Sequence, residues 1–251
     1  MTSGRLLAIT TQDGVRLVRL AREEKRNALS IAMRDELEAC FTDAERDASV
    51  AVVVLTGGER VFCAGFDLEE VVATRFEAFR HRVREFNRAV FGFTKPLVVA
   101  VSGAAMAGGF DLALAGDFLL ASETARFAHP EVNFGAAPTL APLWTRIGLA
   151  RATDLVMRGR TVEASEALAI GLIDRLVPAA RLIDEAMELA RELAAKPPQT
   201  LQAVKAAARR IATLDRLEGI QFEAENAARA LFDPANVSRA AGYFRSLGEK
   251  K

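Results

Sequence analysis

The chain has 251 residues, and its 33 basic and 33 acidic side chains give a formal net charge of zero at pH 7. This length suits one large domain with an appended segment, and the balanced charge argues against nucleic acid as a partner, because a phosphate backbone needs a basic surface. No apolar run approaches the ~20 residues that cross a bilayer, the N-terminus has no secretory pattern, and only two cysteines are present. We therefore expect a cytoplasmic protein with no membrane partner and no disulfide framework.

The first 140 residues alternate strand and helix patterns. An Asp13-Gly14 turn between two apolar-rich runs predicts a hairpin over residues 6–20. Ser30 is a typical N-cap ahead of a helical apolar pattern that ends near Asp47. Strands that alternate with helices indicate an α/β fold with crossover connections. The remaining elements predicted here are strands at 50–55, 97–101 and 118–121 and helices at 76–90 and from Gly109 onward.

The rest of the chain shows helical patterns, and no strand is expected after about residue 140. Several of these helices carry an apolar face, and Ile211, Leu214 and Leu217 are examples of the apolar residues in this stretch. A single core cannot easily bury such faces, so this region is predicted to make contacts between subunits. The predicted helices cover residues 149–158, 162–169, 182–195, 200–213, 216–232 and 236–247.

Two glycine turns each follow a predicted strand and lead into the start of a helix. The first covers residues 62–68 and the second residues 108–113. Glycine lets a ligand approach the backbone closely, and the first N–H groups of a helix have no internal partner. One amide from each turn, those of Phe66 and Gly108, would form an oxyanion hole with two donors. The spacing alone does not require the two turns to meet.

Two acidic residues accompany the second turn. Asp111 stands in the first turn of the predicted helix, where a carboxylate is also favoured by the helix dipole alone. Glu131 follows His129 and Pro130 in a later loop. Carboxylates beside an oxyanion hole could move protons to and from a substrate. The less specific alternatives are a dipole role for Asp111, a solvated loop position for Glu131 and a packing role for His129.

In this order and spacing, the motifs resemble those of the crotonase (enoyl-CoA hydratase/isomerase) superfamily. The resemblance implies a spiral core of repeated ββα units over residues 1–195. It also implies a C-terminal helical region over residues 196–251 that builds homotrimers, often paired into hexamers. The substrate would be a coenzyme A thioester, and no metal or redox cofactor is expected, since the chain has no clustered His/Cys ligand set. The matching segments are residues 25–29, 52–57, 62–68, 95–117, 127–131 and 159–178.

The resemblance also implies roles for individual residues. Asp111 and Glu131 would be the catalytic acids, and Phe66 and Gly108 would supply the oxyanion-hole amides. For Asp67, an alternative to a role in coenzyme A binding is that its side chain stabilises the turn in which it lies. Basic side chains near residue 25 suit the phosphates of coenzyme A. The residues implied in coenzyme A binding are Lys25, Arg26, Ala28, Ala64, Asp67 and Leu68, and those implied in lining the acyl pocket are Trp144 and Leu140.

Two departures from the family's hydratases leave the reaction open. Those hydratases hold water between two glutamates, whereas here Glu131 matches one and the shorter Asp111, with roughly 1.5 Å less reach, replaces the other. A glycine-rich run after the acid loop is replaced by residues 138–144. The favoured reaction is hydration of a 2-enoyl-CoA, and the alternatives are a delta-isomerase that uses Glu131 alone and a non-catalytic coenzyme A-binding homologue. Retention of both acids beside both turns argues against the last of these.

Overall fold

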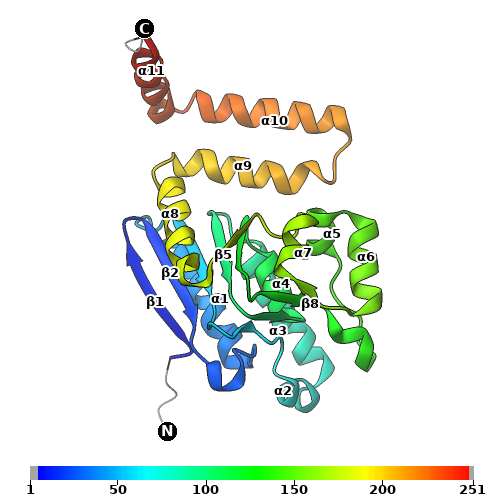
Figure 1. The fold of residues 1–251 in the computed structure, drawn as a ribbon. Coiled ribbons are helices and arrows are strands. Elements are labelled where there is room, and N and C mark those ends of the chain that lie inside the picture. The colour runs from blue at the N-terminus through cyan, green and yellow to red at the C-terminus, as the bar shows by residue number, and fades with distance from the viewer. Residues whose placement is uncertain (1–4, 249–251) are drawn as a thin grey trace. The chain divides into compact units, whose positions relative to one another are not determined.

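Residues 5–248 are described by a computed structural model of the chain (Figure 1). The chain divides into two compact units, Met1–Ala194 and Ala195–Lys251. The first unit combines two β-sheets with helices, whereas the described part of the second is helical. Within residues 5–248, no helix is both long enough and apolar enough to cross a membrane.

A six-stranded sheet forms the frame of the first unit. Its central strands are continuous apolar runs because both of their faces are covered, as is usual in parallel sheets. The first two strands form the predicted antiparallel hairpin, in which Asp13 and Gly14 both have positive φ, and the other neighbours are parallel. In spatial order the strands are β1 (Leu7–Gln12), β2 (Val15–Leu20), β3 (Val52–Thr56), β5 (Leu97–Val101), β7 (Phe118–Ser122) and β10 (Arg175–Val177).

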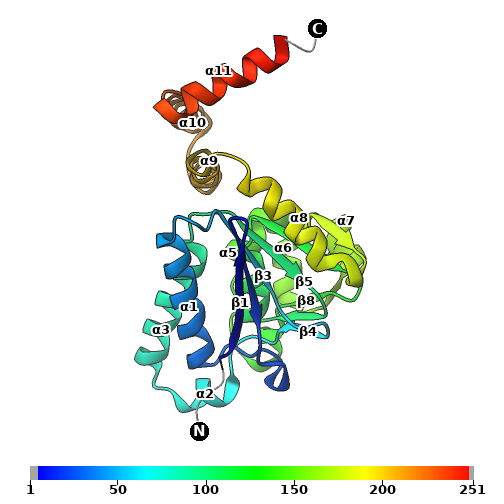
Figure 2. The ribbon, with the colours of Figure 1, turned by 90° about the vertical axis from the view of Figure 1, so that its left-hand side faces the viewer.

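Helices cover both faces of this sheet (Figure 2). Successive residues of a strand point to opposite faces. Val54 therefore packs with helix α8 (Leu182–Ala194), while Val53 joins the core on the other face with helices α1 (Ile31–Arg46) and α3 (Phe76–Phe91). Full burial of one such side chain is worth about 1.5–3 kcal/mol, which makes these layers the main source of stability.

Helix α1 begins where the sequence predicts. The Ser30 hydroxyl accepts a hydrogen bond from the Met33 N–H at 3.1 Å, so it satisfies one of the amides that a helix start leaves free. Leu37, Phe41 and Ala44 then recur at helical spacing and are buried. The cap and the apolar stripe together place α1 on the sheet.

A second, smaller sheet consists of strands of two or three residues. Each of its first three strands lies between a strand of the large sheet and a helix, so the chain repeats the order strand, strand, helix. This repeat confirms the expected ββα spiral. In spatial order the strands are β4 (Val61–Cys63), β6 (Ala104–Met106), β8 (Arg126–Ala128) and β9 (Val162–Glu163), and the last pair is antiparallel.

The expectation that strands stop after residue 140 is wrong. β9 pairs with β8, and β10 extends the large sheet by pairing with β7. The helix predicted from residue 162 therefore begins later, at Ala164. Strands of two or three residues are too short to show an alternation of apolar and polar residues. Whether such a segment forms a strand therefore depends on its pairing partner and not on its own sequence. The remaining α-helices of this unit are α2 (Leu68–Ala73), α4 (Gly108–Leu114), α5 (Ala141–Ile147), α6 (Leu149–Arg158) and α7 (Ala164–Ala169), of which α5 has no predicted counterpart.

The second unit begins at Ala195, one residue before the predicted boundary. Its central helix starts with a capping box, in which Asp215 accepts from the Glu218 N–H at 2.8 Å and Glu218 accepts from the Asp215 N–H at 3.2 Å. The trimer-building role expected for this unit stays a prediction. Its described helices are α9 (Pro198–Ile211), α10 (Arg216–Leu231) and α11 (Pro234–Gly248).

Candidate active site

The first glycine turn connects β4 to α2. Gly65 has a φ of +93°, a conformation that residues with a side chain rarely adopt. Its carbonyl accepts a hydrogen bond from the Leu29 N–H at 2.8 Å, and the Ala64 N–H donates to the Arg26 carbonyl at 3.0 Å. The segment around residues 26–29 therefore holds this turn in place.

The second glycine turn connects β6 to α4 and contains a strained residue. Ala107 has a φ of 50° and a ψ of −128°, a combination that costs a residue with a Cβ roughly 1–3 kcal/mol. Its N–H donates to the Ala128 carbonyl at 2.9 Å, which ties the turn to β8. A Cβ on Gly109 would lie 2.2 Å from the Cys63 carbonyl oxygen, so only glycine lets α4 start this close to β4.

The two turns meet in space, which their spacing in the sequence did not require. A Cβ built on Gly65 would lie 3.2 Å from the Gly108 nitrogen, and one built on Gly108 would lie 3.0 Å from the Phe66 ring. Within residues 5–248, neither the Phe66 N–H nor the Gly108 N–H donates a hydrogen bond. Two amide donors without a protein acceptor thus lie on adjoining turns, as an oxyanion hole requires.

The two acids contact different nitrogens of one buried histidine. Asp111 lies in the first turn of α4, and Glu131 lies in the 3-10 helix Pro130–Phe134. The His129 Nε2 is 3.6 Å from Asp111 Oδ1, and its Nδ1 is 3.4 Å from Glu131 Oε1. The exposed fraction is 16 % for the Asp111 side chain, 14 % for that of Glu131 and 1 % for that of His129. The fold therefore brings both acids together around one imidazole.

Burial gives Asp111 the properties of a proton carrier near neutral pH. Removal from water is the main reason that the pKa of its carboxyl rises to about 6. The imidazole of His129 opposes this rise, the negative charge of Glu131 adds to it, and a hydrogen bond with the Thr139 side chain lowers the pKa again. A carboxyl whose pKa lies close to the working pH can both give and accept a proton, which suits acid–base catalysis.

The residues expected to bind coenzyme A come from two segments that lie side by side. Arg22 links them, because its guanidinium donates to Asp67 Oδ2 at 2.9 Å and to the Ala28 carbonyl at 3.2 Å. Burial raises the pKa of Asp67, but the Arg22 guanidinium and the backbone N–H groups of Glu69 and Glu70 together hold that pKa below its usual value. The Asp67 carboxylate thus fixes its turn through an ion pair. Of the six predicted residues, three are exposed (Lys25, Arg26 and Leu68) and three are half-buried (Ala28, Ala64 and Asp67).

The residues expected to line the acyl pocket follow the acid loop. Leu140 is half-buried and packs against the main core, and Trp144 lies on α5 with 39 % of its surface exposed. Helix α5 contacts α4, which carries Asp111. The segment that holds both side chains is thus anchored next to an acid-bearing helix, and their role in acyl binding stays a prediction.

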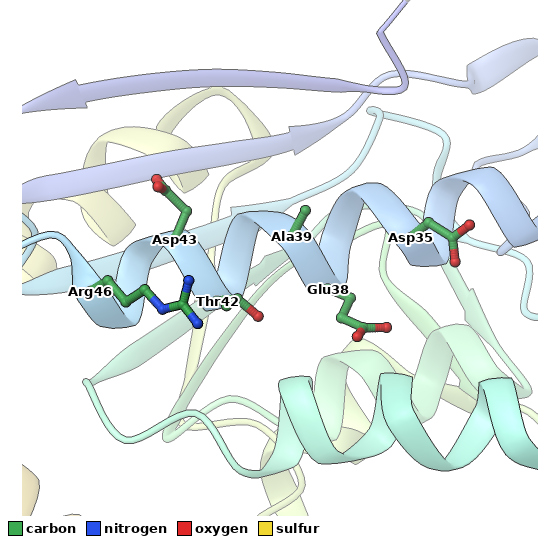
Figure 3. A pocket seen from close by; sticks show the side chains of 6 residues that line it. All are labelled: Asp35, Glu38, Ala39, Thr42, Asp43 and Arg46. Carbon is green, nitrogen blue, oxygen red and sulfur yellow. The ribbon is translucent and has the colours of Figure 1, made fainter.

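A separate hollow of about 470 Å³ lies along α1 (Figure 3). Three carboxylates contribute to its lining, and one of them, that of Asp43, is paired with Arg16 at 2.6 Å. Carboxylates repel the phosphates of coenzyme A, so this hollow does not suit the expected substrate. Its lining residues are Asp35, Glu38, Ala39, Thr42, Asp43 and Arg46.

The chain is similar to known proteins over most of its length. The sequence profile described as enoyl-CoA hydratase/isomerase matches residues 10–241. The chain belongs to the enoyl-CoA hydratase/isomerase family. A probable enoyl-CoA hydratase from Rhizobium meliloti is 35 % identical over 86 % of each chain, and the 2,3-dehydroadipyl-CoA hydratase of Escherichia coli is 34 % identical over 81 % of each. The crystal structure of the enoyl-CoA hydratase from Bacillus anthracis matches with a TM-score of 0.90 at 30 % identity, over 96 % of this chain and 97 % of that one.

Two residues of this enoyl-CoA hydratase/isomerase family member have more contacts than the sequence predicts. His129 has the expected packing role, since its ring stacks on Phe110 with 4.8 Å between centroids, but it also contacts both acids. Glu131 lies inside the 3-10 helix that follows His129, so no strand or helix period in the sequence indicates these contacts. Arg22 is the second, and its partner Asp67, 45 residues away, could not be found from local sequence.

Proposed function

We propose that the protein is a hydratase that adds water across the C2=C3 double bond of a 2-enoyl-CoA thioester. The observation that carries this proposal is the pair of largely buried carboxylates, Asp111 and Glu131, beside two turns in which the Phe66 and Gly108 amides have no acceptor in the described chain. The relatives from Rhizobium meliloti and Escherichia coli, both named as hydratases, support the same reaction class.

In the proposed reaction, the N–H groups of Phe66 and Gly108 donate to the thioester carbonyl oxygen. Negative charge collects on that oxygen while the water oxygen bonds to C3, and one such donor is typically worth about 2.7–4 kcal/mol. One carboxylate takes a proton from the attacking water, and the other group, as a carboxylic acid, delivers a proton to C2. One O–H bond and the C2=C3 π bond break, and one C–O and one C–H bond form. No metal or redox cofactor is invoked.

The coenzyme A part of the substrate would bind along the surface around residues 64–68. The exposed cations Lys25 and Arg26 would meet its phosphates there, because charge-assisted hydrogen bonds to phosphate are strong. The acyl chain would run toward Leu140 and Trp144. Calorimetry with acetyl-CoA tests this part of the proposal, and no binding at millimolar concentration would overturn it.

A double-bond isomerase that uses Glu131 alone is the second candidate. The observation that favours it is the shorter side chain of Asp111, which loses roughly 1.5 Å of reach relative to glutamate. A misplacement of about 1 Å can cost on the order of 100-fold in rate. An isomerase needs only one carboxylate to carry a proton between C2 and C4, so it would tolerate this change.

Ultraviolet absorbance of the conjugated enoyl thioester separates the candidates. Hydration of crotonyl-CoA removes the conjugated band, whereas an isomerase acting on a 3-enoyl-CoA creates it. We expect loss of the band with crotonyl-CoA and with longer 2-enoyl chains. No change with either substrate class would overturn the hydratase and favour the non-catalytic alternative.

We further propose that the protein assembles into a trimer or a hexamer through α9, α10 and α11. Apolar side chains on these helices are exposed in the single chain, such as those of Val204, Leu217 and Val237. Exposed apolar groups that gather on one part of a surface mark contact sites. Light scattering at micromolar concentration should give three or six times the chain mass of 27.1 kDa, and a monomer mass would overturn this proposal.

A further inference from the structure

His129 occupies a place that the proposed reaction has not yet used. It lies between the two acids, with one ring nitrogen toward each, and only 1 % of its side chain is exposed. We propose that His129 is a positioning residue that links Asp111 and Glu131 into one hydrogen-bonded unit and so sets the spacing of the two carboxylates. This inference rests on the proposed function, because the spacing matters where two acids share one water.

The imidazole is more deeply buried than the acids it touches. Its ring stacks on Phe110 with an interplanar angle of 34°, and Phe110 itself is almost fully buried. The residue before it, Ala128, accepts a hydrogen bond from the Ala107 N–H at 2.9 Å. Packing of the ring and the hydrogen bond at the neighbouring Ala128 hold His129 in place, so both carboxylates contact a side chain with a fixed position.

Several polar atoms around the His129 ring have no hydrogen-bond partner among the described residues, so they are free to join Asp111, His129 and Glu131 into the proposed hydrogen-bonded bridge. In the part of the chain that the structure describes, Asp111 Oδ1, Glu131 Oε2 and His129 Nε2 are buried without a hydrogen-bond partner. The contacts of 3.4 and 3.6 Å are long for hydrogen bonds, and such bonds tighten when a substrate closes the site. A neutral imidazole carries one N–H and serves one carboxylate, whereas an imidazolium carries two and serves both.

The charges that face the ring come from both elements packed against it. Asp111 faces it from α4 and Glu131 from the 3-10 helix, and the Thr139 side chain reaches Asp111 from the segment that follows. Two carboxylates in a small dry site repel each other. A ring nitrogen that donates to a carboxylate stabilises its charge, and an imidazolium between the two acids would offset their repulsion.

Kinetics of His129→Gln test the inference, with His81→Gln as the matched control because His81 is exposed on α3. Without the bridge, the carboxylates lose their reference point, so kcat should fall by about 10- to 100-fold while KM stays nearly unchanged. Since His129 lowers the pKa of Asp111, its removal should move the alkaline limb of the kcat profile to higher pH. If His129 only packed, its substitution would neither move the alkaline limb of the kcat profile nor lower kcat selectively over KM.

Nitrogen NMR tests the bridge in the absence of substrate. The chain has two histidines, so the imidazole signals of the His81→Gln variant belong to His129 alone. We expect these signals to shift when Asp111→Asn or Glu131→Gln is added, and to stay in place with Asp35→Asn on the exposed part of α1. Shifted signals in a protein that does not hydrate crotonyl-CoA would overturn the proposed function alone. Signals that ignore both acid substitutions, or a His129→Gln variant with the wild-type kcat and pH profile, would overturn the bridge.

Discussion

The two sheets of the first unit differ in how their shape is maintained. In the large sheet the strands β1, β2, β3, β5 and β7 have five or six residues each, and burial of valine and leucine on both faces stabilises the sheet. The small sheet has strands of two or three residues. Its geometry depends on close backbone contacts, such as that of Gly109 with the Cys63 carbonyl. The large sheet therefore acts as a frame and the small sheet carries the site, so changes in the two regions should have different consequences.

The largest separation of activity from stability is expected at Glu131. Glu131→Gln keeps the shape of the side chain and removes the titratable proton carrier, so kcat/KM should fall by about 10²- to 10⁴-fold. The denaturation midpoint should barely move, because the frame is untouched. Asp111→Asn sharpens the result, since a hydratase should lose a similar factor and an isomerase much less. Full activity of Glu131→Gln would contradict the assignment of the active site to Asp111 and Glu131.

Asp111 should also make stability depend on pH in an unusual direction. Its pKa is raised to about 6 in the folded protein, against about 3.9 for an unfolded aspartate. The folded state therefore binds the proton more tightly, and the resulting stability is present below about pH 4 and lost as the pH rises through about 6. Between about pH 4 and pH 6, the free energy of unfolding of the wild type should fall by about 3 kcal/mol relative to that of Asp111→Asn. Urea unfolding of both proteins at several pH values measures the difference, and parallel curves would contradict it.

Two glycines compare the site region with the frame directly. Gly109→Ala would force a Cβ to within 2.2 Å of a backbone carbonyl, so α4 must shift, with a loss of about 1–3 kcal/mol of stability and of most activity. Gly116→Ala meets first the Val99 side chain at 2.7 Å, which lies in the frame. It should destabilise to a smaller extent and leave kcat nearly unchanged. Thermal unfolding and kcat of both variants check this, and equal kcat values would argue against the comparison.

The smallest effect is expected from the cap of α1. Ser30→Ala removes the hydroxyl that accepts from Met33 and should cost about 1 kcal/mol of stability. Since the cap belongs to the frame, kcat should match the wild type at temperatures where the protein is folded. A fall in kcat without a change in the unfolding midpoint would show that frame and site are not separable in this way.

The sequence predicted the frame better than the site. Long apolar runs such as residues 97–101 and the Ser30 cap are local signals, and both are confirmed. The small sheet was implied only by the resemblance to the family and not by its own residues, because the pairing of such short strands depends on partners far away in the chain, and the same is true of β10. The contact between Gly65 and Gly108 likewise depends on a spiral that no local pattern describes.

For the candidate acids too, the sequence did not predict contacts between residues that are distant in the chain. Their types and order were visible in the sequence, but the distance between them was not. His129 links them through contacts on two elements, α4 and the 3-10 helix that follows β8. An interpretation that considers each residue alone assigns such a histidine to packing. In the structure His129 packs on Phe110 and also contacts both acids.

The two cysteines lie one in each of the compared regions. Cys40 is buried on α1, and Cys63 is buried at the end of β4, where its thiol donates to the Asn27 carbonyl at 3.0 Å. Burial raises the pKa of Cys63 to about 12 and also raises that of Cys40, so both thiols are inert toward alkylating reagents while the protein is closed. Each becomes reactive only when its own surroundings open. Mass-spectrometric labelling rates at the two thiols would therefore report separately how often the frame and the small sheet open, without any engineered probe.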